Sequence, residues 1–149
     1  WIKQRVMFQV KKPKYEELPE TLKLLMLFRE EFSDIYPDAD IEKVAITIQE
    51  HFDNGFICNA YMDNKIVGSV AAMPTEWWFS KEMFIAETWL YILPKYRTFK
   101  VARGLLKKMK EYTKNKKMTL VLPISTAKDT PALYERLGFK NMGNIWRYK

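Results

Sequence analysis

The chain has little of the residues that build cross-linked, metal-rich or low-complexity proteins. Its 149 residues include one cysteine, one histidine, five glycines and seven prolines. A single cysteine cannot form an internal disulfide, and it excludes a multi-cysteine zinc site and a secreted disulfide scaffold. The low glycine and proline content excludes collagen-like architecture. We therefore expect an ordinary globular protein from a reducing compartment, with no metal.

Long hydrophobic runs are also missing. No apolar stretch approaches the roughly 18 residues of a membrane span, and the segment from Trp1 to Arg5 lacks the apolar core of a signal peptide. The composition is 48% hydrophobic and 29% charged, which excludes intrinsic disorder and is enough for one well-filled core. We expect a single cytoplasmic domain over residues 1–149, with no membrane partner.

Charge is unevenly distributed along the chain. Residues 1–93 contain 10 Lys or Arg against 15 Asp or Glu, whereas residues 94–149 contain 15 against 3. The basic C-terminal third would attract a polyanion such as a phosphorylated cofactor or a nucleic acid, and the acidic N-terminal part would attract a cation. Solvated lysines on an outer helix face are the simpler explanation for each lysine taken alone.

Apolar periodicity and turn residues predict the elements in the order β-α-α-β-β-β-α-β-α-β. This order indicates an α/β fold in which a mixed central sheet is flanked by helices on both faces. We expect the Trp77-Trp78-Phe79 segment to lie in an exposed loop, 74–82. The strands are predicted at 5–10, 56–62, 66–73, 83–93, 117–123 and 139–148, and the helices at 15–32, from Asp38 or Asp40 to Asn54, 100–114 and 130–137.

The segment Ile92 to Leu106 runs from a strand through Pro94 directly into a helix. A strand-turn-helix unit directs unpaired backbone N–H groups to one spot, and the helix dipole adds positive potential there. Basic side chains in the same segment add to that charge. Such units are common, so the pattern alone gives only weak support for phosphate binding.

Two runs of residues resemble a known family. Ala132 to Phe139 reads A-L-Y-E-R-L-G-F and resembles the A-L-Y-E-x-L-G-F motif of the GNAT superfamily of acyl-CoA-dependent N-acyltransferases. Leu90 to Arg97 resembles that family's L-Y-V-x-P-x-Y-R motif, and the order and separation of the two runs agree with it. The resemblance covers essentially the whole chain. It implies a GNAT-like fold and transfer of an acetyl group from acetyl-CoA, a cosubstrate, to a primary amine.

The resemblance also implies cofactor-binding residues. Family members pair the pantetheine arm with the strand before the proline and hold the pyrophosphate with the amides of an R/Q-x-x-G-x-G/A loop. Lys100 stands where the first glycine is usual, so we expect a costlier backbone conformation there. Glycine-poor loops of this kind are expected in divergent branches, phage-encoded members among them. The residues carried over are Leu90, Tyr91 and Ile92 for pantetheine, and Arg97, Thr98, Phe99, Lys100, Val101, Ala102 and Arg103 for the pyrophosphate.

A second departure concerns pantetheine. The family often has an asparagine seven positions before the tyrosine of its second motif, and Ala127 occupies that position here. Ser125 or Thr126 are the candidate substitutes.

Two residues are implied to perform the chemistry. Tyr134 matches the family tyrosine that protonates the departing thiolate, and core packing is the alternative role for a tyrosine on an amphipathic helix. Glu87 is a carboxylate within an apolar strand, which is unfavourable unless it is paired or used. We predict that Glu87 is the general base, with an ion pair to Lys or Arg as the alternative. Glu76 is the second choice.

Two further residues are candidates with simpler explanations. We expect His51 at the surface or edge of its helix, with substrate contact as the alternative, and Cys58 as a small core residue. In this family the acidic first helices and the Trp77-Trp78-Phe79 loop would line the acceptor side, which suits a cationic or aromatic amine, a peptide N-terminus or a lysine.

Two other functions stay open. One is a catalytically inactive binding module on the same fold, and the other is a nucleic-acid or partner-binding protein that uses the basic C-terminal third. No nucleic-acid motif is recognised, so nucleic acid is the less favoured partner. Exposed sheet edges permit a homodimer.

Overall fold

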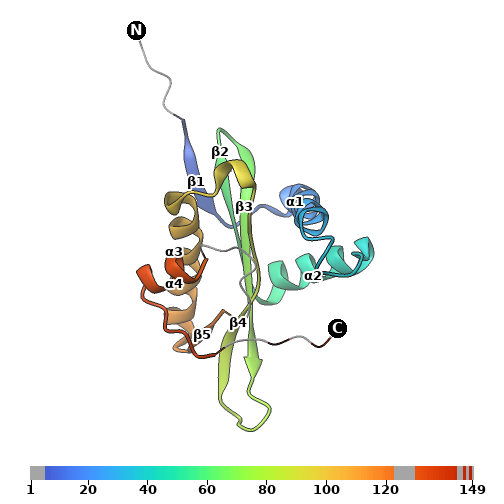
Figure 1. The fold of residues 1–149 in the computed structure, drawn as a ribbon. Helices are drawn as coiled ribbons and strands as arrows, with labels where there is room; N and C mark the ends of the chain where they lie inside the picture. The colour runs from blue at the N-terminus through green and yellow to red at the C-terminus, as the bar shows by residue number, and fades with distance from the viewer. Residues whose placement is uncertain (1–5, 123–129, 144–145, 147, 149) are drawn as a thin grey trace.

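A five-stranded sheet with the order β1-β2-β3-β4-β5 forms the middle layer of the computed structural model, which describes residues 6–122, 130–143, 146 and 148 (Figure 1). The first four strands pair antiparallel, and β5 pairs parallel to β4. This arrangement confirms the predicted mixed sheet. The strands are β1 (Phe8–Lys11), β2 (Phe56–Met62), β3 (Lys65–Glu76), β4 (Met83–Ile92) and β5 (Leu120–Val121).

Helices cover both faces of the sheet, as the element order predicted. Two lie on one face and two on the other (Figure 1). The first pair is α1 (Leu18–Glu31), which follows the short 3-10 helix η1 (Tyr15–Glu17), and α2 (Ile41–Asn54). The second pair is α3 (Phe99–Lys116), which follows η2 (Pro94–Tyr96), and α4 (Thr130–Arg136).

Local sequence signals explain where the elements begin and end. The Lys43 N–H donates to Asp40 Oδ1 at 3.1 Å, so Asp40 caps α2. Thr98 caps α3 in the same way, since its Oγ1 accepts from the Val101 N–H at 3.4 Å. Asp63 and Asn64, with φ of 47° and 66°, form the tight turn between β2 and β3.

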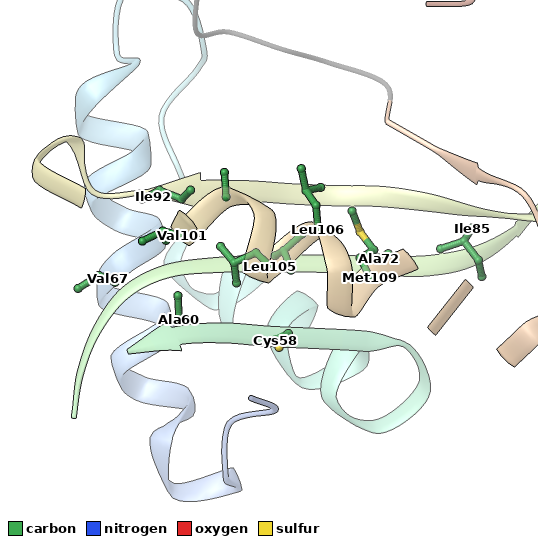
Figure 2. Packing of buried hydrophobic residues seen from close by; sticks show 12 residues of the cluster. Cys58, Ala60, Val67, Ala72, Ile85, Ile92, Val101, Leu105, Leu106 and Met109 are labelled. Carbon is green, nitrogen blue, oxygen red and sulfur yellow. The ribbon is translucent and has the colours of Figure 1, made fainter. Parts of the chain in front are cut away.

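The larger core lies between α3 and the sheet. Leu105, Leu106 and Met109 project from α3 and are fully buried against β2, β3 and β4 (Figure 2). Cys58 belongs to this cluster, and burial raises the pKa of its thiol to about 12, which agrees with the predicted core role. A smaller cluster fills the opposite face and contains Leu18, Leu25, Ile48, Ile57 and Ala71.

The sequence prediction differs from the structure at the end of β3. Pro74, Thr75 and Glu76 continue β3 instead of beginning a loop. At the hairpin tip Trp78 is 93% exposed, as expected, but the Trp77 ring stacks on Phe84 with their centroids 4.0 Å apart. The stacking explains why the hairpin continues beyond the predicted end of the strand, because it joins the two strands near the tip.

The predicted last strand is also not found in the described part of its range. Phe139 to Gly143 form no strand, and residues 144, 145, 147 and 149 lie outside the described residues. The Gly143 N–H donates to Asn141 Oδ1 at 2.9 Å, a local bond that competes with strand pairing. Over the ranges that the structure describes, no helix is long and apolar enough to cross a membrane.

Candidate active site

One edge of β4 opens where its pairing with β5 stops. The last parallel pair is Ala86 with Val121, and beyond it no described strand pairs with this edge. The Leu93 N–H donates to Val67 O of β3, on the opposite side of β4, at 2.9 Å. Because backbone groups alternate along a strand, Leu90 and Ile92 direct theirs to the open edge. Such an edge can hydrogen-bond an extended amide-containing group.

A bulge in β4 lies at the start of the open edge. Ala71 is opposite Trp89 and Ala72 is opposite Glu87, so Thr88 is an extra residue. The bulge changes the alternation of side chains. Glu87 lies on the face of α3 with Ile85, whereas Thr88 and Trp89 both contact α2.

Glu87, the predicted general base, lies on the α3 side of this edge. It is 8% exposed, and burial raises the pKa of its carboxyl to about 7. Within the described residues the Glu87 carboxyl makes no hydrogen bond and no ion pair. The alternative role as a structural ion pair is therefore not observed there. A carboxyl with a pKa near 7 exists in both protonation states at neutral pH, which suits a group that accepts a proton.

Tyr134, the predicted general acid, lies near Glu87. Its half-buried ring packs against the large core from α4, 5.7 Å from the Phe139 ring. Burial raises the pKa of the phenol, and the charge of Glu87 raises it further. The structure thus brings both predicted catalytic side chains to the same face of β4. The phenol keeps its proton at neutral pH and can donate it.

The start of α3 carries the predicted pyrophosphate loop. Lys100 lies in the first helical turn and does not have a positive φ, so the expected backbone strain is absent. Val101 and Ala102 are buried and fix the helix against the sheet. The Arg136 guanidinium of α4 stacks on the Phe99 ring at 3.7 Å, and Arg103 is exposed. Free backbone N–H groups, the helix dipole and these cations can hold a phosphate.

Arg97 makes a contact that the sequence did not predict. One terminal nitrogen lies 2.7 Å and 2.6 Å from the two carboxylate oxygens of Glu31, and Nε donates to Ile92 O at 2.8 Å. The Tyr91 hydroxyl donates to Glu31 Oε1 at 3.3 Å. Arg97 therefore ties the loop to the C-terminal end of α1, and a pyrophosphate would compete with Glu31 for it. Its cofactor-binding role stays a prediction.

The prediction for His51 is wrong. The side chain is 4% exposed, and its ring packs on Trp89 with their centroids 5.0 Å apart. Its Nδ1 lies 2.7 Å from Thr47 O and its Nε2 lies 2.6 Å from Thr88 Oγ1. The helical spacing from Ile48 is the signal that could have placed this residue inward. Thr88 was missed because its contact with His51 joins two residues that are 37 positions apart in the sequence.

The remaining predicted residues lie elsewhere. Glu76 pairs with Met83 near the hairpin tip. Because Met83 lies four residues before Glu87 along β4, Glu76 is about 13 Å from the start of the open edge. The structure does not bring it to the site. The candidates Ser125, Thr126 and Ala127 lie outside the described residues. In the described part of the chain, no His, Cys, Asp and Glu side chains gather into a metal-binding group.

Comparison with known proteins agrees with the family that the two sequence motifs indicate. The profile of the acetyltransferase (GNAT) domain matches residues 53–141, which is 89 of the 149 residues. No curated protein matches the chain. Several solved structures are similar to the chain at 16% to 20% sequence identity, and at such identities the similarity establishes the fold alone.

The first is the aminoglycoside N-acetyltransferase AAC(6')-Iy in complex with CoA, with a TM-score of 0.74, 16% identity, and coverage of 100% of this chain and 98% of that one. The second is an aminoglycoside acetyltransferase from an uncultured soil metagenomic sample in complex with sisomicin, with a TM-score of 0.71, 16% identity and 95% of each chain covered. The third is an acetyltransferase from Trypanosoma brucei, with a TM-score of 0.71, 20% identity, and coverage of 96% and 99%.

Proposed function

Because the chain belongs to the GNAT acetyltransferase family, we propose that it transfers an acetyl group from acetyl-CoA to a primary amine by direct attack on the thioester. The observation that most supports this proposal is the position of Glu87 and Tyr134 on one face of β4, beside its open edge. The buried carboxyl has a pKa of about 7 and the phenol a raised pKa. This pair supplies one proton acceptor and one proton donor at neutral pH.

Acetyl-CoA would bind along the open edge and at the start of α3. The backbone groups of Leu90 and the N–H of Ile92, which face the open edge, are the proposed partners of the pantetheine arm. Tyr91 lies between them, but its backbone groups are directed to Ser69 of β3. The pyrophosphate would lie at the first turn of α3, where backbone N–H groups and the helix dipole favour an anion. The residues proposed to contact it are Arg97, Thr98, Phe99, Lys100, Val101, Ala102 and Arg103.

The reaction combines the making of a C–N bond and the breaking of a C–S bond with proton transfers. Glu87 takes a proton from the ammonium form of the acceptor, and the free amine then attacks the thioester carbon. The Leu90 N–H stabilises the oxyanion that forms as the C–N bond is made. When the C–S bond breaks, Tyr134 donates its proton to the thiolate. The proton left on the new amide nitrogen passes through solvent to the phenolate, and Glu87 releases to solvent the proton that it took, so both side chains return to their starting states.

The acceptor is proposed to be a cationic amine. The α1 side of β4 presents the Glu31 carboxylate, which is 25% exposed, beside the Tyr91 ring. Two structural relatives are aminoglycoside acetyltransferases, one of them bound to sisomicin. Aminoglycosides, polyamines and peptide amines are therefore the classes to test.

The first experiment is calorimetric titration of the protein with acetyl-CoA, followed by measurement of thiol release with four amines. The panel is sisomicin, spermidine, a peptide with a free α-amine and a peptide with one internal lysine. Micromolar acetyl-CoA binding and turnover with any panel amine support the proposal. Binding without turnover favours an inactive binding module. A duplex oligonucleotide in the same titration tests the rival that uses the basic C-terminal third.

Tyr134→Phe tests the general acid. Turnover is expected to fall about 10²- to 10⁴-fold with unchanged acetyl-CoA affinity. The matched control is Tyr112→Phe, because Tyr112 is also half-buried and stacks on Phe56 at 5.0 Å, but its pKa is raised by burial alone. Equal turnover in both variants excludes a proton-donating role for Tyr134.

A further inference from the structure

A second polar cluster lies across β4 from Glu87, on the face that α2 covers. It consists of Thr88, His51, Trp89 and Ser69. The Trp89 indole N–H donates to Ser69 Oγ at 2.9 Å, which fixes the ring against which His51 packs. His51 is buried and Thr88 is exposed. The cluster therefore connects a buried imidazole to one exposed hydroxyl beside the open edge of β4.

The hydrogen bonds assign the proton positions. Thr47 O can only accept, so His51 Nδ1, which lies 2.7 Å away, must carry a hydrogen. A neutral imidazole then has an acceptor at Nε2, and the Thr88 hydroxyl donates to it over 2.6 Å. With its hydrogen committed to His51, the Thr88 oxygen offers lone pairs to whatever approaches from outside.

The surroundings of His51 favour its neutral form. Burial lowers the pKa of the imidazole, and this outweighs the bond to Thr47 and the charge of Glu50 on the same helix, both of which raise it. From β4 the ring meets Thr88 and Trp89, which carry no charge. The nearby cluster that α1, α2, β2 and β3 contribute is apolar and contains Leu18, Leu25, Ile48, Ile57 and Ala71.

The bulge brings the Trp89 ring to the same face of β4 as the Thr88 hydroxyl. Without the extra residue, Thr88 and Trp89 would lie on opposite faces of β4. With it, both contact α2, and Thr88 directly follows Glu87 at the open edge. A thioester held along this edge would have Glu87 on the α3 side and Thr88 on the α2 side.

We propose that Thr88 Oγ1 is the hydrogen-bond acceptor for an N–H of the attacking amine, and that His51 is the positioning residue that keeps this oxygen an acceptor. The inference rests on the proposed acetyl transfer. When His51 is protonated, its Nε2–H donates to Thr88 Oγ1 and the hydroxyl hydrogen turns outward. The amine N–H then meets a donor instead of an acceptor, and amine binding weakens.

The first test needs no substrate. His51 is the only histidine in the chain, so nitrogen NMR of the tag-free protein reports one imidazole. At pH 7 we expect the neutral tautomer with the hydrogen on Nδ1. In Thr88→Val the Nε2 resonance is expected to shift because its donor is lost. A hydrogen on Nε2, a protonated ring at pH 7, or an unchanged resonance in Thr88→Val overturns the inference.

The second test measures turnover with each panel amine that the wild-type protein acetylates. Thr88→Val is expected to lower kcat/KM about tenfold or more, mainly through the KM for the amine. Thr88→Ser keeps the hydroxyl and is expected to stay within about threefold of wild type. The rise in amine KM with acid that follows protonation of His51 should be lost in Thr88→Val and kept in Thr88→Ser.

Two outcomes separate this inference from the proposed function. If the wild-type protein acetylates no panel amine, the proposed function fails and this inference fails with it. If wild type and Thr88→Val acetylate an amine equally and with the same pH profile, only the amine subsite is wrong. Acetyl-CoA affinity and the melting temperature monitor folding, and Thr88→Ala replaces Thr88→Val if the latter does not fold.

Discussion

The two faces of β4 hold titratable groups of opposite kind. On the α3 face, burial raises the pKa of the Glu87 carboxyl to about 7, and on the α2 face burial lowers the pKa of His51. The physical cause is the same, because burial removes a charge from water. It favours the protonated, neutral carboxyl of Glu87 and the unprotonated, neutral imidazole of His51. One strand with one bulge therefore separates a proton-exchanging side from a side that stays neutral and polar.

The largest expected effect comes from removing the carboxylate on the α3 face. Glu87→Gln keeps the shape of the side chain but cannot take a proton. We expect kcat/KM to fall about 10²- to 10⁴-fold at pH 7, with acetyl-CoA affinity retained. The control is Glu76→Gln at the hairpin tip, which should keep wild-type turnover. Similar rates for both variants would show that the two carboxylates do not differ in function.

Stability should also differ between the core and the outer surface of the helices. Leu105→Ala removes a fully buried side chain from the α3 face and is expected to lower the free energy of unfolding by about 2–5 kcal/mol. Leu27→Ala on α1 changes a side chain that is 45% exposed and should cost well under 1 kcal/mol. Urea denaturation of the two variants measures this difference, and equal midpoints would contradict it.

The opposite pKa shifts predict opposite pH dependences of stability. Glu87 has a raised folded pKa, so the folded state binds more protons than the unfolded state between about pH 4.5 and 7, and stability falls as the pH rises through this window. The expected loss is up to about 3 kcal/mol. Glu87→Gln should abolish this slope. Urea midpoints that fall equally in wild type and Glu87→Gln from pH 4.5 to 7 would assign the slope to another group.

His51 predicts the reverse slope. Its folded pKa is lowered, so below the unfolded value near 6.5 the unfolded state binds the proton more readily, and stability falls as the pH falls. The slope is expected to be missing in His51→Gln, measured relative to that variant's own stability at pH 8. An unchanged acid slope would show that carboxylates elsewhere dominate acid unfolding.

The smallest effect concerns the contact that joins the cofactor loop to α1. Glu31→Gln removes an ion pair that is partly exposed, with side-chain exposures of 36% for Arg97 and 25% for Glu31, and should change stability by at most about 1 kcal/mol. If Arg97 contacts the pyrophosphate, freeing it should tighten acetyl-CoA binding. Calorimetry measures the change, and unchanged or weaker binding would argue against that role for Arg97.

Much of the fold was predicted from local patterns. The Asp40 cap, the turn at Asp63 and Asn64, and the helical periodicity of α3 are each set by neighbours in the sequence, and the structure agrees with them. The end of β3 and the described residues 139–143 were predicted wrongly. In the first, a cross-strand aromatic contact extends the strand, and in the second the Gly143 N–H bonds to the nearby Asn141 side chain and not to another strand.

The sequence by itself determined the order of the elements as far as α4, the family and the types of residue available for chemistry, because motifs, caps and periodicity are local properties. Tertiary structure decided which of these residues meet. The burial that moves the Glu87 pKa comes from elements far away in the sequence, and so do the contact of Arg97 with Glu31 and that of His51 with Thr88. A bulge depends on the register between two strands, so no single strand's sequence could reveal that Thr88 and Trp89 lie on the same face.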